Sequence, residues 1–383
     1  MRIALVIEQF DPHCGGAERW TWDFATWLRR EGYEVHVVAR RFAETAAPLG
    51  IIAHAVSPLA RRLRFAEEAE SLLRRLDVDV IHDMGSGWYG DVFQPHGGSR
   101  RAASEQNLAL APPLLRPLKR VVQHWLPRYR QFDRLVQRQF ADQRRAYIAL
   151  SQMVARDFSR WHGVPSERVR LIYNGVDTER FTPDARGTFR EEQRRKLGSS
   201  PEECVVLIVA HNFRLKGVPA LLRAVGELRR QGQPVRLVIA GGRPTMRWHL
   251  LARRWCDPQG VTFAGPVDDP RPLYAAADVY AQPTHYDPCS LVVLEALACG
   301  LPVITTRYNG AGEQIDSTVS GRVLEHPSNH RLLARAIESY LNPAVRARAG
   351  EAARSVALAH TFERNCREVV AVYEELQARR RAA

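Results

Sequence analysis

The chain has 383 residues, 45% of them hydrophobic, which is enough for two domains with buried cores. Lysine and arginine number 55 against 42 acidic residues, and the formal net charge of +13 predicts attraction to anionic lipid, nucleic acid or phosphorylated substrates. No apolar run approaches the ~20 residues of a membrane-spanning helix, and the six cysteines show no CxxC pairing or zinc spacing. We therefore expect a reduced, cytosolic protein without a signal peptide, a disulfide framework or a membrane crossing.

The first half opens with the apolar run RIALVIEQF, which predicts a buried strand. Gly15 and Gly16 stand immediately before a helical pattern from Glu18 to Arg30, and EGYEVHVVAR predicts the next strand. This order places Gly16 where backbone N–H groups can approach a phosphate, although the GxGxxG fingerprint of nicotinamide and flavin enzymes is missing. A tight turn explains the glycine pair about equally well.

Strands and helices continue to alternate through IIAHAVSP, a helix over 66–76 and DVDVIHDMG. Asp77 and Asp79 form a DxD pair, but they enter a strand, so we interpret them as topology rather than as metal ligands. His96 follows a short strand and precedes two glycines, a position that ligand-contacting residues take in open α/β sheets. A structural role for this histidine is about as well supported.

Residues 100–145 are strongly basic, with apolar and aromatic side chains interleaved. Prolines at 112, 113 and 117 are expected to break the front of this segment, while its back half has helical spacing. Basic and aromatic residues in this pattern suit a segment lying on an anionic bilayer, with contacts from Arg116, Lys119, Arg120 and Trp125. A solvated helix with one core face is the alternative, and no recognised nucleic-acid motif accompanies the charge.

A strand at YIAL, a helix beginning near Ser151 and a strand at VRLIY complete this half, and the polar residues 182–203 predict a linker. The second half repeats the strand–helix alternation and ends in a long amphipathic helix over 362–380. Two such halves predict two doubly wound domains facing across a cleft. Arg214 and Lys216 follow a strand, where two cations suit a diphosphate; surface cations are the plainer interpretation.

The most informative stretch runs from 279 to 313 and predicts a strand, a polar loop, a helix beginning at Leu291 and a second strand. The free N–H groups near Cys289, Ser290 and Leu291 could hold a phosphate. Asp287 and Glu295 lie eight positions apart, so they suit sugar hydroxyls better than a single shared phosphate. The alternative is an ordinary βαβ unit with two surface acids.

Together these features resemble the retaining glycosyltransferases of family 4, which have the GT-B fold. The matching segments are GGAER (15–19), NGVDTERF (174–181), RLKG (214–217), IAGG (239–242), FAGPV (263–267) and DPCSLVVLEALACGLPVI (287–304). Within the family, the opening loop, the basic segment and RRAYIALSQMVARDF are most similar to the lipopolysaccharide core glucosyltransferase I group. Asp287 stands where the family usually has glutamate and Ser290 where it has glycine, which leaves the donor sugar open.

The resemblance implies an α/β protein of the GT-B fold, with two Rossmann-like doubly wound domains facing across a cleft. The acceptor-binding domain would comprise residues 1–172, with the membrane-facing segment 100–145, and would be completed by 362–383. The nucleotide-sugar-binding domain would comprise residues 173–361, and the C-terminal helix would cross back to the first domain.

The resemblance also assigns roles position by position. Arg214 and Lys216 match the pair that neutralises the donor diphosphate, and Glu295 matches the acid that accepts hydrogen bonds from the ribose. The implied donor-binding residues are Gly16, Arg214, Lys216, Gly241, Val267, Asp287, Cys289, Ser290, Leu291 and Glu295. The implied catalytic residues are Asp287, Lys216, Arg214 and His96. The implied acceptor-binding residues are Gly15, Glu18, Arg19 and His96.

The implied function is transfer of a hexose, with glucose preferred, from UDP-hexose to a membrane-linked glycan, above all the heptose of the lipopolysaccharide core. We expect UDP-hexose as a substrate, no metal or other cofactor, no nucleic acid, and a cytoplasmic protein peripheral to the anionic inner membrane. Three alternatives remain: an exopolysaccharide or glycolipid acceptor, a GT-B nucleotide-sugar epimerase, and a non-enzymatic basic membrane-binding module. The epimerase would need no acceptor, and the module would keep its affinity when Glu295 is changed.

Overall fold

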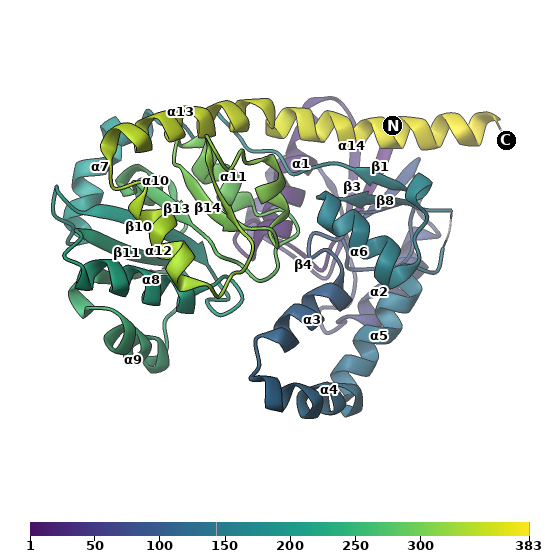
Figure 1. Ribbon diagram of the computed structural model, residues 1–383. Coiled ribbons are helices and arrows are strands. Elements are labelled where there is room, and N and C mark those ends of the chain that lie inside the picture. The colour runs from purple at the N-terminus through teal and green to yellow at the C-terminus, as the bar shows by residue number, and fades with distance from the viewer. Residues whose placement is uncertain (143, 383) are drawn as a thin grey trace. The chain divides into compact units, whose positions relative to one another are not determined.

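The computed structural model describes residues 1–142 and 144–382, which form two compact α/β units (Figure 1). Unit 1 comprises Met1–Tyr173 and Glu363–Ala383, and unit 2 comprises Asn174–Phe362. Each unit is built on one large parallel sheet with helices connecting its strands, and unit 1 has a small two-stranded sheet in addition. The predicted fold class, two Rossmann-like domains, is therefore confirmed. Residues 143 and 383, inside two of the predicted segments, lie outside the described residues.

The sheet of unit 1 has the strand order β5-β3-β1-β6-β7-β8-β9. Its strands are β1 (Arg2–Val6), β3 (Glu34–Ala39), β5 (Ile52–Ala55), β6 (Val80–Asp83), β7 (Val92–Phe93), β8 (Ala146–Ala149) and β9 (Val169–Leu171), while β2 (Gln9–Phe10) pairs with β4 (Arg41–Phe42). The order reverses direction between β1 and β6, so a topological switch point lies where these neighbouring strands end. Loops that follow β1 and β6 meet at that point.

Unit 1 has seven α-helices in the part of the chain that the structure describes, and all but α4 pack toward its sheet or its core. They are α1 (Gly16–Arg30), α2 (Leu63–Leu73), α3 (Arg100–Ala109), α4 (Arg116–Trp125), α5 (Pro127–Gln139), α6 (Gln152–His162) and α14 (Phe362–Ala382). The C-terminal helix α14 returns to unit 1, as predicted: Asn365 Oδ1 accepts a 2.9 Å hydrogen bond from Trp20 Nε1. Tyr373 OH lies 2.5 Å from His82 Nδ1, so α14 is fastened to both α1 and β6.

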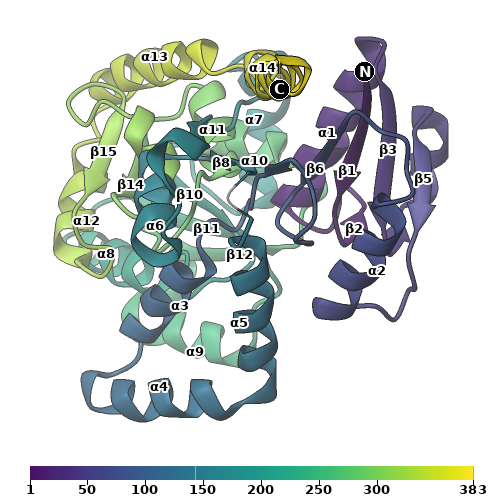
Figure 2. The ribbon, with the colours of Figure 1, turned by 90° about the vertical axis from the view of Figure 1, so that its right-hand side faces the viewer.

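The basic segment differs from its prediction at the front. Residues 100–109 form the regular helix α3, whose N-cap Ser99 accepts a hydrogen bond from the Ala102 N–H. Pro117 lies in the first turn of α4, where a missing N–H costs no intrahelical hydrogen bond. The prolines therefore separate α3 from α4 instead of breaking the helical structure. Figures 1 and 2 show α4 at the outer end of the group formed by α3, α4 and α5.

The sheet of unit 2 has the order β12-β11-β10-β13-β14-β15, with its switch point between β10 and β13. Its strands are β10 (Cys204–Ala210), β11 (Val235–Gly241), β12 (Val261–Gly265), β13 (Val279–Ala281), β14 (Val303–Thr306) and β15 (Gly321–Leu324). Its helices are α7 (Ala185–Lys196), α8 (Val218–Arg230), α9 (Met246–Trp255), α10 (Arg271–Ala276), α11 (Leu291–Ala298), α12 (His330–Glu338) and α13 (Pro343–Ala359). The apolar faces of α8 and α12 pack with β10 and β11 in the core.

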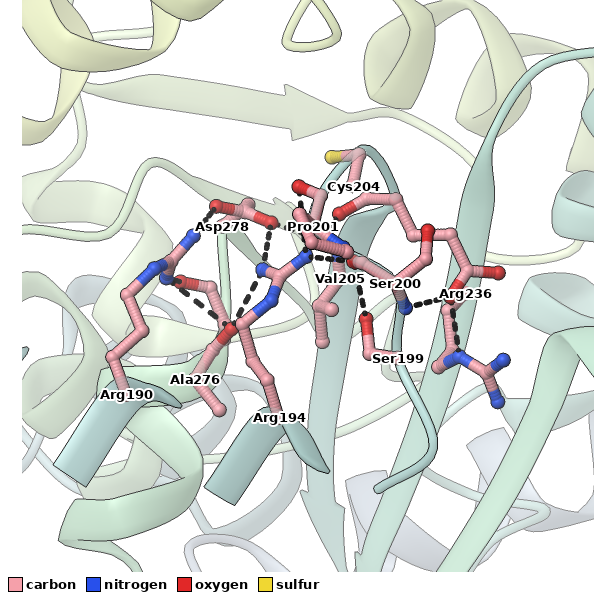
Figure 3. Close-up of polar contacts among 12 residues, drawn as sticks. Arg190, Arg194, Ser199, Ser200, Pro201, Cys204, Val205, Arg236, Ala276 and Asp278 are labelled. Atoms are coloured by element: carbon pink, nitrogen blue, oxygen red, sulfur yellow. Dashed lines mark hydrogen bonds and ion pairs between the residues drawn. The ribbon is translucent and has the colours of Figure 1, made fainter. Parts of the chain in front are cut away.

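The predicted linker at residues 182–203 is wrong, because most of it forms α7, which packs against α10. The one buried residue of α7 is Arg194, and it and the half-buried Arg190 both reach Asp278, directly before β13 (Figure 3). Arg190 Nη2 lies 2.6 Å and Arg194 Nη1 3.0 Å from the two carboxylate oxygens. The polar composition of α7 therefore hides a helix that is fixed to the sheet by buried charge.

Candidate functional site

The loops that follow β10 and β13 meet at the switch point of the unit 2 sheet. Lys216, from the first loop, forms an ion pair with Asp287 Oδ2, from the second. The ammonium and the carboxylate are both mostly buried, and such pairs are strong only when further hydrogen bonds satisfy them. Two residues that the sequence placed in the donor site are therefore in direct contact.

Gln282 supplies the further hydrogen bonds and links this pair to α11. Its Nε2 donates to Asp287 Oδ2 at 3.0 Å and to Ser290 Oγ at 3.1 Å, while its Oε1 accepts from Tyr280 OH at 2.8 Å. The four residues joined by these bonds, Tyr280, Gln282, Asp287 and Ser290, are all buried. Because a fully bonded buried network holds its members in one arrangement, Gln282 fixes Asp287 and Ser290 relative to each other.

Asn309 holds the same loop from the other side. Its Oδ1 accepts from the Ser290 N–H at 3.3 Å and from the Ala311 N–H at 3.1 Å. The backbone of Asp287 pairs with the 308–310 segment: its N–H donates to Tyr308 O at 2.8 Å and its carbonyl accepts from Gly310 N at 2.9 Å. The loop that carries Asp287 is therefore bonded along its backbone as well as through its side chains.

Ser290 is the N-cap of α11, and the first turn of that helix begins directly beside the Lys216–Asp287 pair. The first N–H groups of any helix have no intrahelical acceptor and carry partial positive charge. They therefore add to the Lys216 ammonium as a site for an anion. Asn174 Nδ2 also donates to Cys289 O at 2.8 Å, so the residue before the cap is held in place.

Glu295 lies one turn further along α11 and accepts a 2.7 Å hydrogen bond from Tyr274 OH. Burial and then the charge of Glu295 raise the pKa of Tyr274 well above its usual value, so the phenol stays protonated and donates. The half-buried carboxylate thus has a fixed orientation and lone pairs that can accept from hydroxyl groups.

The loop that carries Lys216 approaches the 283–285 segment closely at Gly217. Gly217 has φ +86°, and a Cβ at this position would lie 2.1 Å from Pro283 O. The His285 N–H donates to Leu215 O at 2.8 Å, which joins the two loops. Burial and then the charge of Arg214 lower the pKa of His285 to about 4, so this imidazole is neutral at pH 7. Arg214 itself is exposed, two residues before Lys216 in the same loop.

The other residues implied for donor binding, except Gly16, lie around the same edge of the unit 2 sheet. Gly241 ends β11, next to the loop after β10. Val267 follows β12 by two residues and is half-buried. Leu291 opens α11 and is also half-buried, whereas Cys289 is buried, and burial raises the pKa of its thiol. Gly16 belongs to unit 1, where it is the first residue of α1.

The residues implied for acceptor binding all lie in unit 1, in two places. Gly15, Glu18 and Arg19 lie at the start of α1, where burial raises the pKa of the Glu18 carboxyl. His96 follows β7 and lies over the Trp20 ring, with centroids 4.7 Å apart. Burial lowers the pKa of His96 to about 3, and its Nε2 has no hydrogen-bond partner among the described residues. At neutral pH it is an uncharged hydrogen-bonding group.

The basic residues predicted to contact a membrane have internal partners in unit 1. Arg116 Nε and Nη2 donate to the carbonyls of Ala111 and Ala109, and Lys119 Nζ donates to Asn107 O. These bonds satisfy carbonyls at the C-terminal end of α3, a common use of cationic side chains. Arg120 pairs with Glu105 at 2.8 Å, whereas Trp125 is 79% exposed.

Two family models match the chain, one in each half. The model described as Glycosyltransferase Family 4 matches residues 14–180, and the model described as Glycosyl transferases group 1 matches residues 189–356. Both models describe glycosyltransferases, and together they cover most of the chain. The second match contains the Lys216–Asp287 pair and Glu295, and the first contains His96.

Individual relatives also carry the name of a glycosyltransferase. The chain is 31% identical over 254 residues to the D-inositol 3-phosphate glycosyltransferase of Corynebacterium jeikeium, a match that covers 63% of this chain and 60% of the relative. The chain spans about half the length of the D-inositol 3-phosphate glycosyltransferases that it matches, from 43% to 60% of each.

Two solved structures share the fold along nearly the whole chain. WaaG, a glycosyltransferase involved in lipopolysaccharide biosynthesis, superposes with a TM-score of 0.80 at 21% identity, covering 97% of this chain and 99% of WaaG. HepE of Anabaena in complex with UDP-glucose gives a TM-score of 0.72 at 20% identity, covering 98% and 100%.

Sequence patterns did not identify four residues that organise the site: Tyr274, Tyr280, Gln282 and Asn309. All four are buried: Tyr274 lies on α10, Tyr280 and Gln282 lie on or next to β13, and Asn309 follows β14. Their bonds join segments that are separate in the chain. Gln282 is one residue past the end of β13, and its polar side chain in an otherwise apolar run was the one available signal. Within residues 1–142 and 144–382, no cluster of three or more His, Cys, Asp or Glu side chains is arranged to hold a metal ion.

Proposed function

We propose that the chain is a retaining glycosyltransferase that moves a hexose from UDP-hexose to a membrane-linked glycan. The observation that supports this most is the set of contacts from Lys216 through Asp287 and Gln282 to Ser290 at the start of α11. An ammonium and helix N–H groups suit a diphosphate, while carboxylates suit sugar hydroxyls. Glu295, held by Tyr274, is the partner for the ribose.

The proposed chemistry uses the leaving group as the base. The bond from the sugar C1 to the diphosphate oxygen breaks, the acceptor oxygen bonds to C1 on the same face, and the diphosphate takes the acceptor proton. Both carboxylates are already engaged, Asp287 by Lys216 and Gln282 and Glu295 by Tyr274, which favours this route over a covalent glycosyl–enzyme. Lys216, Arg214 and the α11 N-terminus would stabilise the departing charge, so metal is dispensable.

The donor and acceptor classes rest on the relatives. HepE binds UDP-glucose and WaaG is involved in lipopolysaccharide biosynthesis, which supports glucose as the hexose and the lipopolysaccharide core as the acceptor. The name of the Corynebacterium jeikeium relative contains an inositol phosphate, so a phosphorylated polyol is the acceptor class that competes with the core heptose.

A membrane-linked acceptor requires the protein to reach a membrane surface, and α4 offers an apolar face for this. Its exposed apolar side chains are Leu118, Val121, Val122 and Trp125, preceded by Leu114 and Leu115. Such a cluster among basic residues suits the interface of an anionic bilayer. We propose that α4 docks through these apolar residues, with Arg116 and Lys119 serving mainly to hold α4 on α3. Among the described residues, no helix has the length and apolarity needed to cross a membrane.

Thermal unfolding with a panel of UDP-, GDP- and ADP-sugars, in the presence of a chelator, tests the donor. Ligand at ~100 times its Kd adds about 2.7 kcal/mol to the free energy of unfolding, which is several degrees in Tm for domains of this size. We expect a shift with UDP-glucose that is lost in Glu295→Ala. The absence of a shift with every nucleotide sugar would exclude the transferase.

Sedimentation with vesicles that contain anionic lipid tests the docking. Replacing the exposed Leu118 and Trp125 by serine should abolish co-sedimentation, because it removes the largest apolar groups of α4. The matched control is Leu59→Ser, which removes a leucine that is 84% exposed elsewhere in unit 1. Equal binding by the doubly substituted protein and this control would exclude docking through α4.

A further inference from the structure

Unit 1 has a second charged cluster at its own switch point, where β1 and β6 end. Glu8, two residues past β1, has a carboxylate that accepts from Arg40 Nε at 3.4 Å and from the Arg62 backbone N–H at 3.3 Å. The Glu8 N–H donates to Ser86 Oγ, in the loop after β6, at 3.2 Å. Ligands of open α/β sheets bind where such loops meet, so this cluster lies at the expected place for one.

Two further cations converge on the ring of Phe132 beside this cluster. Arg62 Cζ lies 4.2 Å and Arg100 Cζ 4.8 Å from the ring centroid. Within the described residues, neither guanidinium has an ion pair or a hydrogen bond to a carboxylate. Desolvation lowers the pKa of Arg100; attraction to Glu8 and Asp83 opposes this shift and repulsion from Arg62 adds to it, although the residue as a whole remains exposed. Glu8 is therefore the one carboxylate bonded within a group of three arginines, which leaves a positive excess.

The backbone at Arg62 is held in a conformation that an arginine rarely adopts. Its φ and ψ are 54° and −115°, and it is the one non-glycine with positive φ in the part of the chain that the structure describes. Such a conformation costs free energy and persists only where the surroundings hold it, often at binding sites. Here the Glu8 carboxylate accepts from the Arg62 N–H, and the Phe132 ring receives its side chain.

The Phe132 ring also forms part of the wall of a cavity of about 700 Å³ between the helices that follow β7. Four cations line it, Arg100 and Arg101 from α3 and Lys119 and Arg120 from α4, together with the carboxylates of Glu105 and Asp133 and the ring of Trp161. A sugar ring fits a cavity of this size, and an aromatic wall with more cations than carboxylates suits an amphipathic, anionic glycan.

We infer that Arg62 and Arg100 form a subsite for a phosphate monoester carried by the acceptor glycan. This inference deepens the proposed function and rests on it. A phosphate monoester has close to two negative charges at pH 7, which the two guanidinium groups beside Phe132 match in charge, and Arg100 is the first residue of α3. Guanidinium groups also bind phosphate oxygens in a bidentate manner. Both arginines belong to unit 1, whereas Lys216, Asp287 and Glu295 belong to unit 2, so the phosphate is assigned to the acceptor.

Titration calorimetry of the full chain with glucose 6-phosphate tests this subsite. Arg62→Gly should weaken binding by about tenfold to a hundredfold, the range for a lost hydrogen bond to a charged group. The same substitution relieves the positive φ, so Tm should stay constant or rise, which separates lost binding from misfolding. Arg61→Gly, at the exposed neighbouring arginine, is the matched control and should bind as the wild type does. Arg100→Ala should repeat the loss of Arg62→Gly.

The companion titrations identify the source of the anion. The assignment to a phosphorylated sugar would be overturned if another anion bound as tightly as glucose 6-phosphate. The anions to test are inorganic phosphate, glucuronate and vesicles of phosphatidic acid. Equal binding of glucose 6-phosphate by Arg62→Gly and Arg61→Gly would also overturn this assignment. UDP-glucose titrated into Arg62→Gly should bind with wild-type affinity. If UDP-glucose binds the wild type and Arg62→Gly but glucose 6-phosphate binds neither, the subsite is wrong and the proposed donor site stands. If UDP-glucose binds neither protein, the proposed function itself is wrong.

Discussion

The substitution Arg194→Ala should lower the free energy of unfolding of unit 2, because the Arg194 guanidinium is the centre of the buried charged cluster between α7 and the sheet. Its Nη1 donates to Asp278 at 3.0 Å, and its Nη2 donates to Ser200 O at 2.8 Å and to Glu203 O at 2.6 Å. Asp278 is buried and also accepts from the Val205 N–H at 2.8 Å, at the start of β10. One guanidinium therefore joins a helix, two strands and the turn before them (Figure 3).

The size of the loss follows from what remains after the substitution. Breaking a buried ion pair by removing one partner costs about 3–5 kcal/mol, because the other charge stays buried. Asp278 keeps Arg190 at 2.6 Å, so we expect the lower end of this range, about 3 kcal/mol. Urea unfolding followed by circular dichroism measures it, with the exposed neighbour Arg195→Ala as control, expected within about 0.5 kcal/mol of the wild type. A loss below about 1 kcal/mol in Arg194→Ala would refute the reasoning.

The same cluster gives this loss a pH dependence. Burial acts to raise the pKa of Asp278, but Arg190 and the other bonded donors outweigh it and hold the pKa below its usual value. A carboxyl whose pKa is depressed by folding stabilises the protein above its unfolded-state pKa of ~3.9 and loses that contribution as pH falls through the lower, folded-state pKa. The difference in stability between the wild type and Arg194→Ala should therefore be full at pH 7 and shrink below about pH 4.

Three further predictions concern the site in unit 2. Gly217→Ala should lower the free energy of unfolding by about 2 kcal/mol or more, since its φ of +86° and the nearby Pro283 carbonyl both oppose a side chain; unchanged urea unfolding would contradict this. Lys216→Ala should reduce turnover of UDP-hexose by roughly a hundredfold or more, while Lys196→Ala, on the exposed face of α7, should leave turnover intact; near-normal turnover in Lys216→Ala would remove its phosphate role. Tyr274→Phe deletes the 2.7 Å hydrogen bond to Glu295 and should cost about 1.5 kcal/mol or more of stability, whereas equal Tm values would show that the bond contributes little.

Most of the fold could be predicted because its strands are short apolar runs followed by helices with one apolar face. The 182–203 segment could not, since apolar periodicity cannot reveal a helix whose buried contacts are made by Arg190 and Arg194. The prediction that prolines break the front of the basic segment was also wrong. Ser99 starts α3 and the prolines fall after it, so they end one helix and begin the next.

The motif residues of the site could be named from the sequence, but their supports could not. Asp287, Ser290 and Glu295 follow one another on a single loop and helix, so their spacing carries information. Tyr274 and Gln282 are recognised only when folding brings them against those residues, across 21 and 5 positions of chain respectively. Local sequence gives no sign of such a hydrogen-bond network, because each member is individually compatible with a plain buried strand or helix.

Calorimetric titration of UDP-glucose, with a chelator present, into the wild type, Lys216→Ala and Lys196→Ala tests the central claim most directly. The account predicts metal-independent binding that Lys216→Ala weakens by at least tenfold, about 1.4 kcal/mol, and that Lys196→Ala leaves unchanged. Equal affinity in all three proteins, or no binding by the wild type, would contradict the assignment of the Lys216–Asp287 pair and α11 to a nucleotide sugar.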